Sequence, residues 1–278
     1  MAPSAMSKAW IVAVAAAGRS PHTVAAYEGD VGQYVRHLDA AHVRDIRRVG
    51  PEDVEDFVRA FATAPGRSGK IRADSTVARV VSAVRSFHAW AADCGLTVDD
   101  PAAAIPSPAA VRAAPMVLER DEIAALLASV DGEDVGALRD RAVLSLLAAT
   151  GIRAAEVVGL DTVDVLDGGR RLAVGGERPR PLPVADPRAL RAWVARGRPL
   201  VGDADGALFP NARGTRLTRQ WIWRLVTDRA RSVDLPAGTS PRTLRNTFAA
   251  LERAAGTPEP VVLELLGRTP WTGLADDA

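Results

Sequence analysis

Apolar residues recur at helical spacing in three stretches of the first third of the chain. The first stretch begins at Ser20-Pro21, where a proline suits the first turn, and continues with Val24, Tyr27, Val31, Tyr34, Val35 and Leu38. The second begins at Pro51 and has on one face Val54, Phe57, Val58 and Phe61. The third is capped by Ser75, stops at Gly95 and turns inward Val77, Val80, Val81, Val84, Phe87 and Trp90. These spacings predict a small helical bundle.

A proline-rich segment interrupts this pattern. Between Asp100 and Pro115, prolines stand among alanines at positions 101, 106, 108 and 115, so that a helix cannot continue through the segment. We therefore expect a first domain at 1–105, a linker at 106–116 and a second domain at 117–278.

The second domain mixes helical and extended patterns. Helical periodicity is found at 121–130, 137–149, 187–196, 218–233, 243–255 and 258–266, and Gly151 closes the second of these helices. Three short β-type segments fall at 163–166, 171–174 and 181–184, with Gly175-Gly176 as a hairpin turn. The predicted fold class is mainly α with a small β-sheet.

Length and composition fit two ordinary soluble domains, since the 278 residues are 47% hydrophobic and 25% charged. The longest apolar stretch near the start, Ala9–Ala17, is too short to span a bilayer. Although Lys8 precedes it, a helical pattern follows Pro21 without a clean cleavage site, so we expect a cytoplasmic protein with no membrane partner. The single cysteine, Cys94, excludes an internal disulfide, and we expect it to be buried. Neither a metal nor a cofactor is expected.

Charge is distributed unevenly behind a formal net charge of +1. Residues 115–169 carry 4 arginines and 11 acidic residues, a net of −7, whereas residues 170–253 carry 17 arginines and 7 acidic residues, a net of +10. Such a basic block is typical of a phosphate-binding face. A solvated face of mixed charge is the alternative, and the preference for arginine over lysine also reflects codon composition in a GC-rich genome.

Four motifs, in order along the chain, resemble those of the tyrosine recombinase (phage integrase) family. Ser20–Tyr27 resembles the opening of the family's core-binding domain, and the run from Gly151 through Arg153 and Glu156 to Leu160 resembles its Gly-x-Arg-x-x-Glu signature. Ser240–Ala249 is similar to the Pro-His-x-Leu-Arg-His-x-Phe-Ala box, and Leu265–Arg268 to the Leu-Leu-Gly-His motif. The resemblance covers nearly the whole chain. It implies a helical, SAM-like core-binding domain and an α+β catalytic-type domain that clamp double-stranded DNA between them.

The resemblance also implies roles for particular arginines. In the family, a tyrosine hydroxyl attacks a DNA phosphate, two arginines hold the non-bridging oxygens, a hairpin lysine protonates the leaving oxygen, and histidines assist proton transfer. Arg153 matches the first arginine and Arg245 the second, whereas Arg242 and Arg268 occupy the histidine positions. We expect these four side chains to converge on one DNA phosphate.

The groups that would carry out the chemistry are missing. Lys70 is the last lysine, so the hairpin offers only Arg178 or Arg180, and we expect both to bind DNA phosphate through their charge. Both are poor proton donors, because a guanidinium group is a very weak acid. By the family's spacing from Arg268, the nucleophile falls at Asp277, and every tyrosine and histidine precedes the linker. We interpret the second domain as C-terminally truncated, since the chain stops where the nucleophile and a final helix are expected.

Several interpretations of these residues stay open. Arg153 and Arg245 can be inherited residues that now form salt bridges, for instance with Glu156, and the arginines at the histidine positions can be drift. Trp221 and Trp223 are two residues apart and cannot both face a helical core, so one either touches DNA or lies half-buried beside an arginine.

Three functions follow from these interpretations. The first is a pseudoenzyme that binds duplex DNA in recombination or integration without cleaving it, associated with the bacterial nucleoid, either with an active recombinase or with further copies of itself. The second is a non-DNA adaptor or a decayed remnant of a mobile element. The third is an active recombinase with an unusual nucleophile such as Ser240 or Thr272. The terminal Trp271 and Asp276-Asp277 form either a frayed tail or a partner contact.

Overall fold

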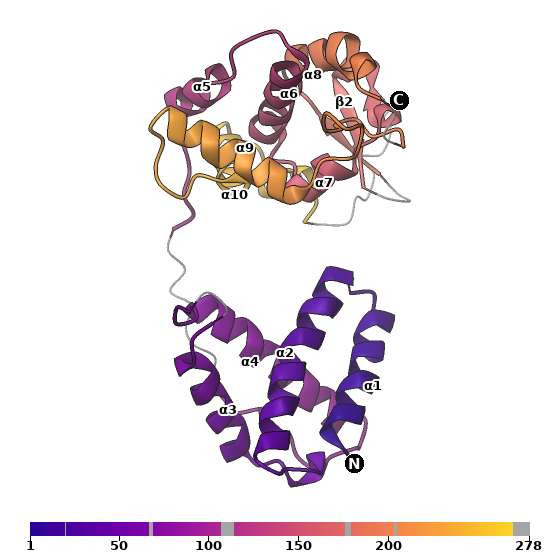
Figure 1. The fold of residues 1–278 in the computed structure, drawn as a ribbon, viewed down its shortest axis with the longest axis vertical. Coiled ribbons are helices and arrows are strands. Elements are labelled where there is room, and N and C mark those ends of the chain that lie inside the picture. The colour runs from indigo at the N-terminus through magenta and orange to yellow at the C-terminus, as the bar shows by residue number, and fades with distance from the viewer. Residues whose placement is uncertain (20, 67–68, 107–113, 176–178, 203–204, 269–278) are drawn as a thin grey trace. The chain divides into compact units, whose positions relative to one another are not determined.

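The computed structural model describes residues 1–278 except for 20, 67–68, 107–113, 176–178, 203–204 and 269–278. The chain divides into two compact units, Met1–Arg112 and Ala113–Ala278 (Figure 1). The linker expected at 106–116 spans this division, and most of it lies outside the described residues. Both units are mainly helical, and the second holds a small antiparallel sheet, which confirms the predicted fold class.

The first unit is a helical bundle whose core is formed by aromatic and branched side chains. Its elements are α1 (Pro3–Ala16), α2 (Pro21–Ala40), a 3-10 turn at Ile46–Arg48, α3 (Pro51–Thr63) and α4 (Asp74–Asp93). Three of the helices begin with a proline, whose fixed φ suits the first turn and whose missing N–H is not needed there. Helix α1 packs on α2 and α4, and the largest buried side chains of the unit are Met6, Trp10, Tyr34, Leu38, Ile46 and Phe87.

Three features of this unit differ from expectation. The apolar stretch Ala9–Ala17 forms much of α1, an unexpected helix whose Trp10 stacks against Tyr27 in the core. Ser75 is not a cap, because α4 begins one residue earlier and its N-terminus makes no side-chain capping bond. Cys94 is exposed, since α4 ends at Asp93 and leaves the thiol beyond its packed face.

Two polar pairs link α2 to α4 in the interior of the first unit. The Tyr34 hydroxyl and Nε2 of His88 lie 2.9 Å apart, and both side chains are completely buried. Burial lowers the pKa of His88 to about 4. Asp30 is 3% exposed and forms an ion pair with Arg79, while burial raises the pKa of its carboxyl group.

The second unit consists of helices before and after a short three-stranded sheet. Its longer helices are α5 (Arg120–Ala128), α6 (Val135–Thr150), α7 (Ala154–Gly159), α8 (Arg188–Ala192), α9 (Arg219–Ser232), α10 (Pro241–Ala254) and α11 (Glu259–Leu265). The strands are β1 (Val165–Leu166), β2 (Arg171–Val174) and β3 (Arg180–Pro183), and further short helical turns are Thr162–Asp164, Asp167–Gly169, Trp193–Gly197 and Arg198–Leu200.

Helix α6 is the centre of this unit. It contacts α5, α8, α9 and α10 (Figure 1), and its Leu144, Leu146 and Leu147 are fully buried. The strands are antiparallel in the order β1-β2-β3, with Val174 opposite Arg180 at the hairpin end. The hairpin turn expected at Gly175-Gly176 lies partly outside the described residues.

The segment expected as one helix at 187–196 changes from an α-helix to a π-helix. Helix α8 passes directly into a π-helical turn at Trp193–Gly197. The Trp193 ring is fully buried and its Nε1 donates to the Leu208 carbonyl at 2.8 Å. A Cβ at Gly197 would lie only 2.4 Å from the Trp193 ring, so a glycine is needed where the π-helical turn packs on that ring. Among the described residues, no helix has both the length and the hydropathy that a membrane crossing requires.

Candidate functional site

The site begins at the turn between α6 and α7. Gly151 ends α6 in the left-handed region with φ of 61°, as the sequence predicted, and its N–H donates to the Leu147 carbonyl. A Cβ at Gly151 would lie 2.6 Å from Cδ1 of Phe248. The tight turn therefore brings α6 close to α10 and directs the next residues, Ile152 and Arg153, into the site.

Arg153 and Glu156 form a pair at the N-terminus of α7. The Glu156 carboxylate accepts from the Arg153 backbone N–H at 2.7 Å and from Arg153 Nη1 at 2.9 Å. This arrangement caps the helix and also fixes the guanidinium, whose side chain remains 43% exposed. The salt bridge considered from sequence for Arg153 is thus present.

Arg245 reaches the same place from α10. Its Nη1 donates to the Gly151 carbonyl at 2.6 Å and its Nη2 to the Leu266 carbonyl at 2.5 Å. Arg245 is half-buried and its partners are backbone carbonyls, not carboxylates. Its positive charge is therefore not neutralised by the groups it bonds.

Three arginines converge on the C-terminal end of α11. The carbonyls of Leu265, Leu266 and Gly267 accept from Arg180, Arg245 and Arg153 at 2.7, 2.5 and 3.0 Å respectively. Carbonyls at a helix C-terminus have no partner within the helix and carry partial negative charge, so guanidinium groups suit them. Gly267 has φ of 58°, and a Cβ there would lie 2.9 Å from Arg180 Nε, so the arginines pack directly on the glycine.

The electrostatics confirm that positive charge is concentrated here. The pKa of Arg245 is lowered to about 10, first by burial and then by Arg153, Arg268 and Arg180, while Glu156 opposes the shift. Arg245 is still charged at neutral pH. The charged groups that act on Arg245 are three guanidinium groups and one carboxylate. The cluster therefore has an excess of positive charge that suits the binding of an anion.

The remaining predicted site residues lie at the edge of this cluster or outside the described residues. Arg268 is exposed and acts on Arg245 through its charge, and Arg242 lies exposed one turn before Arg245 on α10. Neither side chain makes a hydrogen bond or ion pair with a described residue. Arg178 and Asp277 fall among the residues whose structure is not described.

Sequence reasoning missed the backbone partners of the arginines. The Gly151 carbonyl and the last carbonyls of α11 leave no trace in a side-chain pattern. Glu156 was noted as part of the family signature and as a partner for Arg153 but not as a helix cap, although its position three residues after the N-cap is a known capping signal. Among the described residues there is no cluster of histidine, cysteine or acidic side chains that would hold a metal ion.

Comparison with known proteins decides the family. The model of the phage integrase N-terminal SAM-like domain matches residues 11–95, and the model of the phage integrase family matches residues 116–270. The chain belongs to the phage integrase family. Its relatives include tyrosine recombinase XerD of Mycobacterium tuberculosis H37Rv, which is 37% identical over 92% of this chain and 86% of its own. Tyrosine recombinase XerC of Mycobacterium sp. JLS is 36% identical over 91% and 86%.

Solved structures of integrases and recombinases share the fold. A lambda integrase (75-356) dimer bound to a COC' core site aligns with a TM-score of 0.69 at 15% identity, over 96% of this chain and 95% of that one. XerH site-specific recombinase in a post-cleavage complex with a palindromic difH substrate aligns with a TM-score of 0.72 at 16% identity, over 88% and 73%. At these identities the likeness establishes the integrase fold alone.

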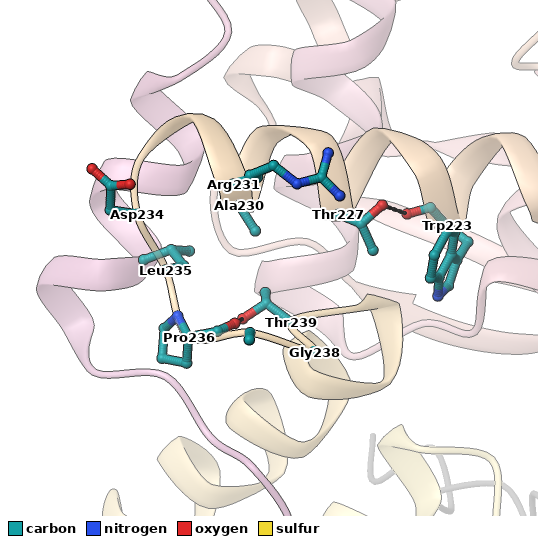
Figure 2. A pocket seen from close by; sticks show the side chains of 10 residues that line it. Trp223, Thr227, Ala230, Arg231, Asp234, Leu235, Pro236, Gly238 and Thr239 are labelled. Atoms are coloured by element: carbon teal, nitrogen blue, oxygen red, sulfur yellow. Dashed lines mark hydrogen bonds between the residues drawn. The ribbon is translucent and has the colours of Figure 1, made fainter.

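This family member also presents an exposed tryptophan on α9. Trp221 lies under Arg139, whose Cζ is 4.4 Å from the ring centroid, so Trp221 is the half-buried tryptophan beside an arginine. Trp223 is 52% exposed and lines a surface pocket of about 420 Å³. Figure 2 shows Trp223, Thr227 and Arg231 along one side of α9, beside the loop 234–239.

Proposed function

We propose that this member of the phage integrase family binds duplex DNA through its phosphates and does not cleave it. The observation that carries the proposal is the convergence of Arg153, Arg245 and Arg268 on one place with Glu156 as the nearby carboxylate. A guanidinium binds phosphate oxygens with two parallel N–H groups, and each arginine here has donors left after its internal bonds. The exposed indole of Trp223 on α9 is a further candidate for contact with the DNA.

The absence of cleavage rests on which side chains stand at the family's chemical positions. Arg242 and Arg268 replace the two histidines, and an arginine is too weak an acid to transfer protons at neutral pH. The sequence contains no lysine after Lys70 and no tyrosine after Tyr34, and Asp277 stands where the nucleophile is expected. The proposed role is therefore architectural or regulatory, on DNA at the nucleoid, together with an active recombinase or with further copies of the chain.

The salt dependence of DNA affinity tests phosphate binding. For the wild type, the logarithm of affinity should fall steeply with the logarithm of salt concentration, by about 0.9 for each phosphate contacted. Arg245→Ala should weaken binding to all sequences alike and flatten the slope by about one unit. Arg188→Ala is the matched control, because Arg188 is 87% exposed and pairs only with Asp186 among the described residues.

Two results would contradict phosphate binding at this site. One is an absence of affinity for duplex DNA at ~50 mM salt by a folded wild-type protein, which would favour the adaptor function. The other is an unchanged slope for Arg245→Ala. If loss of the bonds to Gly151 and Leu266 unfolds that variant, Arg245→Lys keeps the charge without the fork and should weaken affinity while preserving the slope.

A suicide DNA substrate tests the absence of cleavage. The wild type should leave no covalent protein–DNA adduct. An adduct would overturn this half of the proposal, and mapping the linked residue would identify the nucleophile. Ser240 is a poor candidate in the structure, because its hydroxyl lies 3.3 Å from the Thr243 hydroxyl and has no general base among its described partners. Thr272 lies outside the described residues.

A further inference from the structure

Arg180 differs from the other arginines of the site in its burial. It is the first residue of β3 and only 8% exposed, whereas the side chain of Arg153 is 43% exposed and Arg268 lies at the surface. From β3, Arg180 donates Nη1 to the Leu265 carbonyl at 2.7 Å and Nη2 to Glu156 Oε1 at 3.3 Å. Its donors point into the protein.

Glu156 is held from two sides. Its Oε1 accepts from Arg153 Nη1 at 2.9 Å and from Arg180 Nη2 at 3.3 Å. The carboxylate is 18% exposed, so its orientation depends on these bonds more than on water. Arg180 thereby joins β3 to α7 through Glu156 and to α11 through Leu265. Glu156 also accepts from Arg153, and the next carbonyl, that of Leu266, accepts from Arg245.

We infer that Arg180 is a positioning residue that sets the geometry of the phosphate site and does not itself contact phosphate. Sequence placed it among the phosphate ligands, and the structure instead directs its fork at internal acceptors. A lysine is a poor substitute, because a single ammonium group does not have the planar fork that joins two separate acceptors. The inference rests on the proposed function for the identity of the ligand, but its structural part can be tested without DNA.

Hydrogen exchange of the free full-length protein is the first test. The amides of Leu266, Gly267 and Arg268 donate to carbonyls within α11, and they should exchange at least about tenfold faster in Arg180→Ala, because a charge-assisted bond to the end of the helix is lost. The matched control is Arg171→Ala on β2, where the arginine side chain is 54% exposed and pairs with Asp167. The control should exchange like the wild type.

The salt slope of DNA binding is the second test. Arg180→Ala should lower affinity about tenfold while its slope stays parallel to that of the wild type, because no phosphate contact is removed. A slope flatter by about one unit, with unchanged exchange in α11, would make Arg180 a phosphate ligand and overturn the inference. Unchanged exchange together with unchanged affinity would also overturn it.

Two further comparisons keep the outcomes separate. If circular dichroism shows that Arg180→Ala does not fold, Arg180→Lys is measured instead. We again expect faster exchange in α11 and a salt slope of DNA binding parallel to that of the wild type. If the wild type does not bind DNA at all, the proposed function fails, while the exchange experiment still decides whether Arg180 organises α11.

Discussion

Replacement of Gly151 by alanine should destabilise the second unit and disturb the arginine cluster at the same time. Gly151 has φ of 61°, and a Cβ there would lie 2.6 Å from Cδ1 of Phe248 and 3.1 Å from Cδ2 of Leu266. Both neighbours are buried in the packing of α10 against α11 and have little room to move. The Gly151 carbonyl also accepts from Arg245, so a shift of the turn moves a partner of that arginine.

The magnitude has two sources. An L-residue in the left-handed region costs about 1 kcal/mol relative to glycine. Forcing an additional methyl group into a packed core costs roughly 1–3 kcal/mol. Together, Gly151→Ala should lower the free energy of unfolding of the second unit by roughly 2–4 kcal/mol.

Native-state hydrogen exchange of the full-length protein measures this effect locally. Peptides from α6 and α10 should lose protection by that amount, while peptides from α2 and α4 serve as an internal reference. Gly159→Ala is the matched control, because a Cβ there meets nothing within 4 Å and its φ is not left-handed. Its effect should lie within about 0.5 kcal/mol of zero or be slightly stabilising. Equal stability of Gly151→Ala and Gly159→Ala would refute the argument.

Two further predictions concern the polar pairs of the first unit. Both are measured by hydrogen exchange of amides in α2 and α4, after correction for the pH dependence of the intrinsic exchange rates. The pKa of buried His88 is lowered to about 4, so the unfolded chain binds more protons between pH 6.5 and 4, and the unit should lose roughly 3 kcal/mol as pH falls through that range. His88→Gln should abolish most of this loss, and an unchanged pH dependence would contradict it. Arg79→Ala should destabilise the unit by roughly 2 kcal/mol at pH 7 by leaving the Asp30 carboxylate unpaired. Because the pKa of Asp30 is raised in the folded state, protonation favours folding, and the cost of Arg79→Ala should shrink at pH 5; a cost that grows at pH 5 would show that the carboxylate is not the cause.

Side-chain patterns predicted the elements of the site better than its connections. The Gly-x-Arg-x-x-Glu spacing brought Gly151, Arg153 and Glu156 to one turn, and the second arginine motif placed Arg245 on a helix that reaches it. The sequence did not indicate that these arginines would end on backbone carbonyls, because every residue has a carbonyl and only the fold decides which ones lack partners. For the same reason Arg180 was grouped with the phosphate ligands.

The first unit shows a different limit of sequence reasoning. Half of the residues of helix α1 are alanine or valine, so its pattern lacks the polar face that makes an amphipathic helix recognisable. Ser75 was predicted as the cap of α4, but the helix begins one residue earlier, at Asp74. Local capping signals do not fix helix boundaries to that accuracy. The buried pairing of Tyr34 with His88 arises from packing between helices that are remote in sequence.

The arrangement around α11 also has a consequence for biosynthesis. Arg153, Arg180 and Arg245 are translated before Leu265–Gly267, and each takes one of these three carbonyls as a partner. A nascent chain that has emerged only as far as α10 therefore carries the positive charges without the backbone groups that orient them. The arginine cluster is therefore complete only after α11 has been synthesised and has folded back onto α7 and β3.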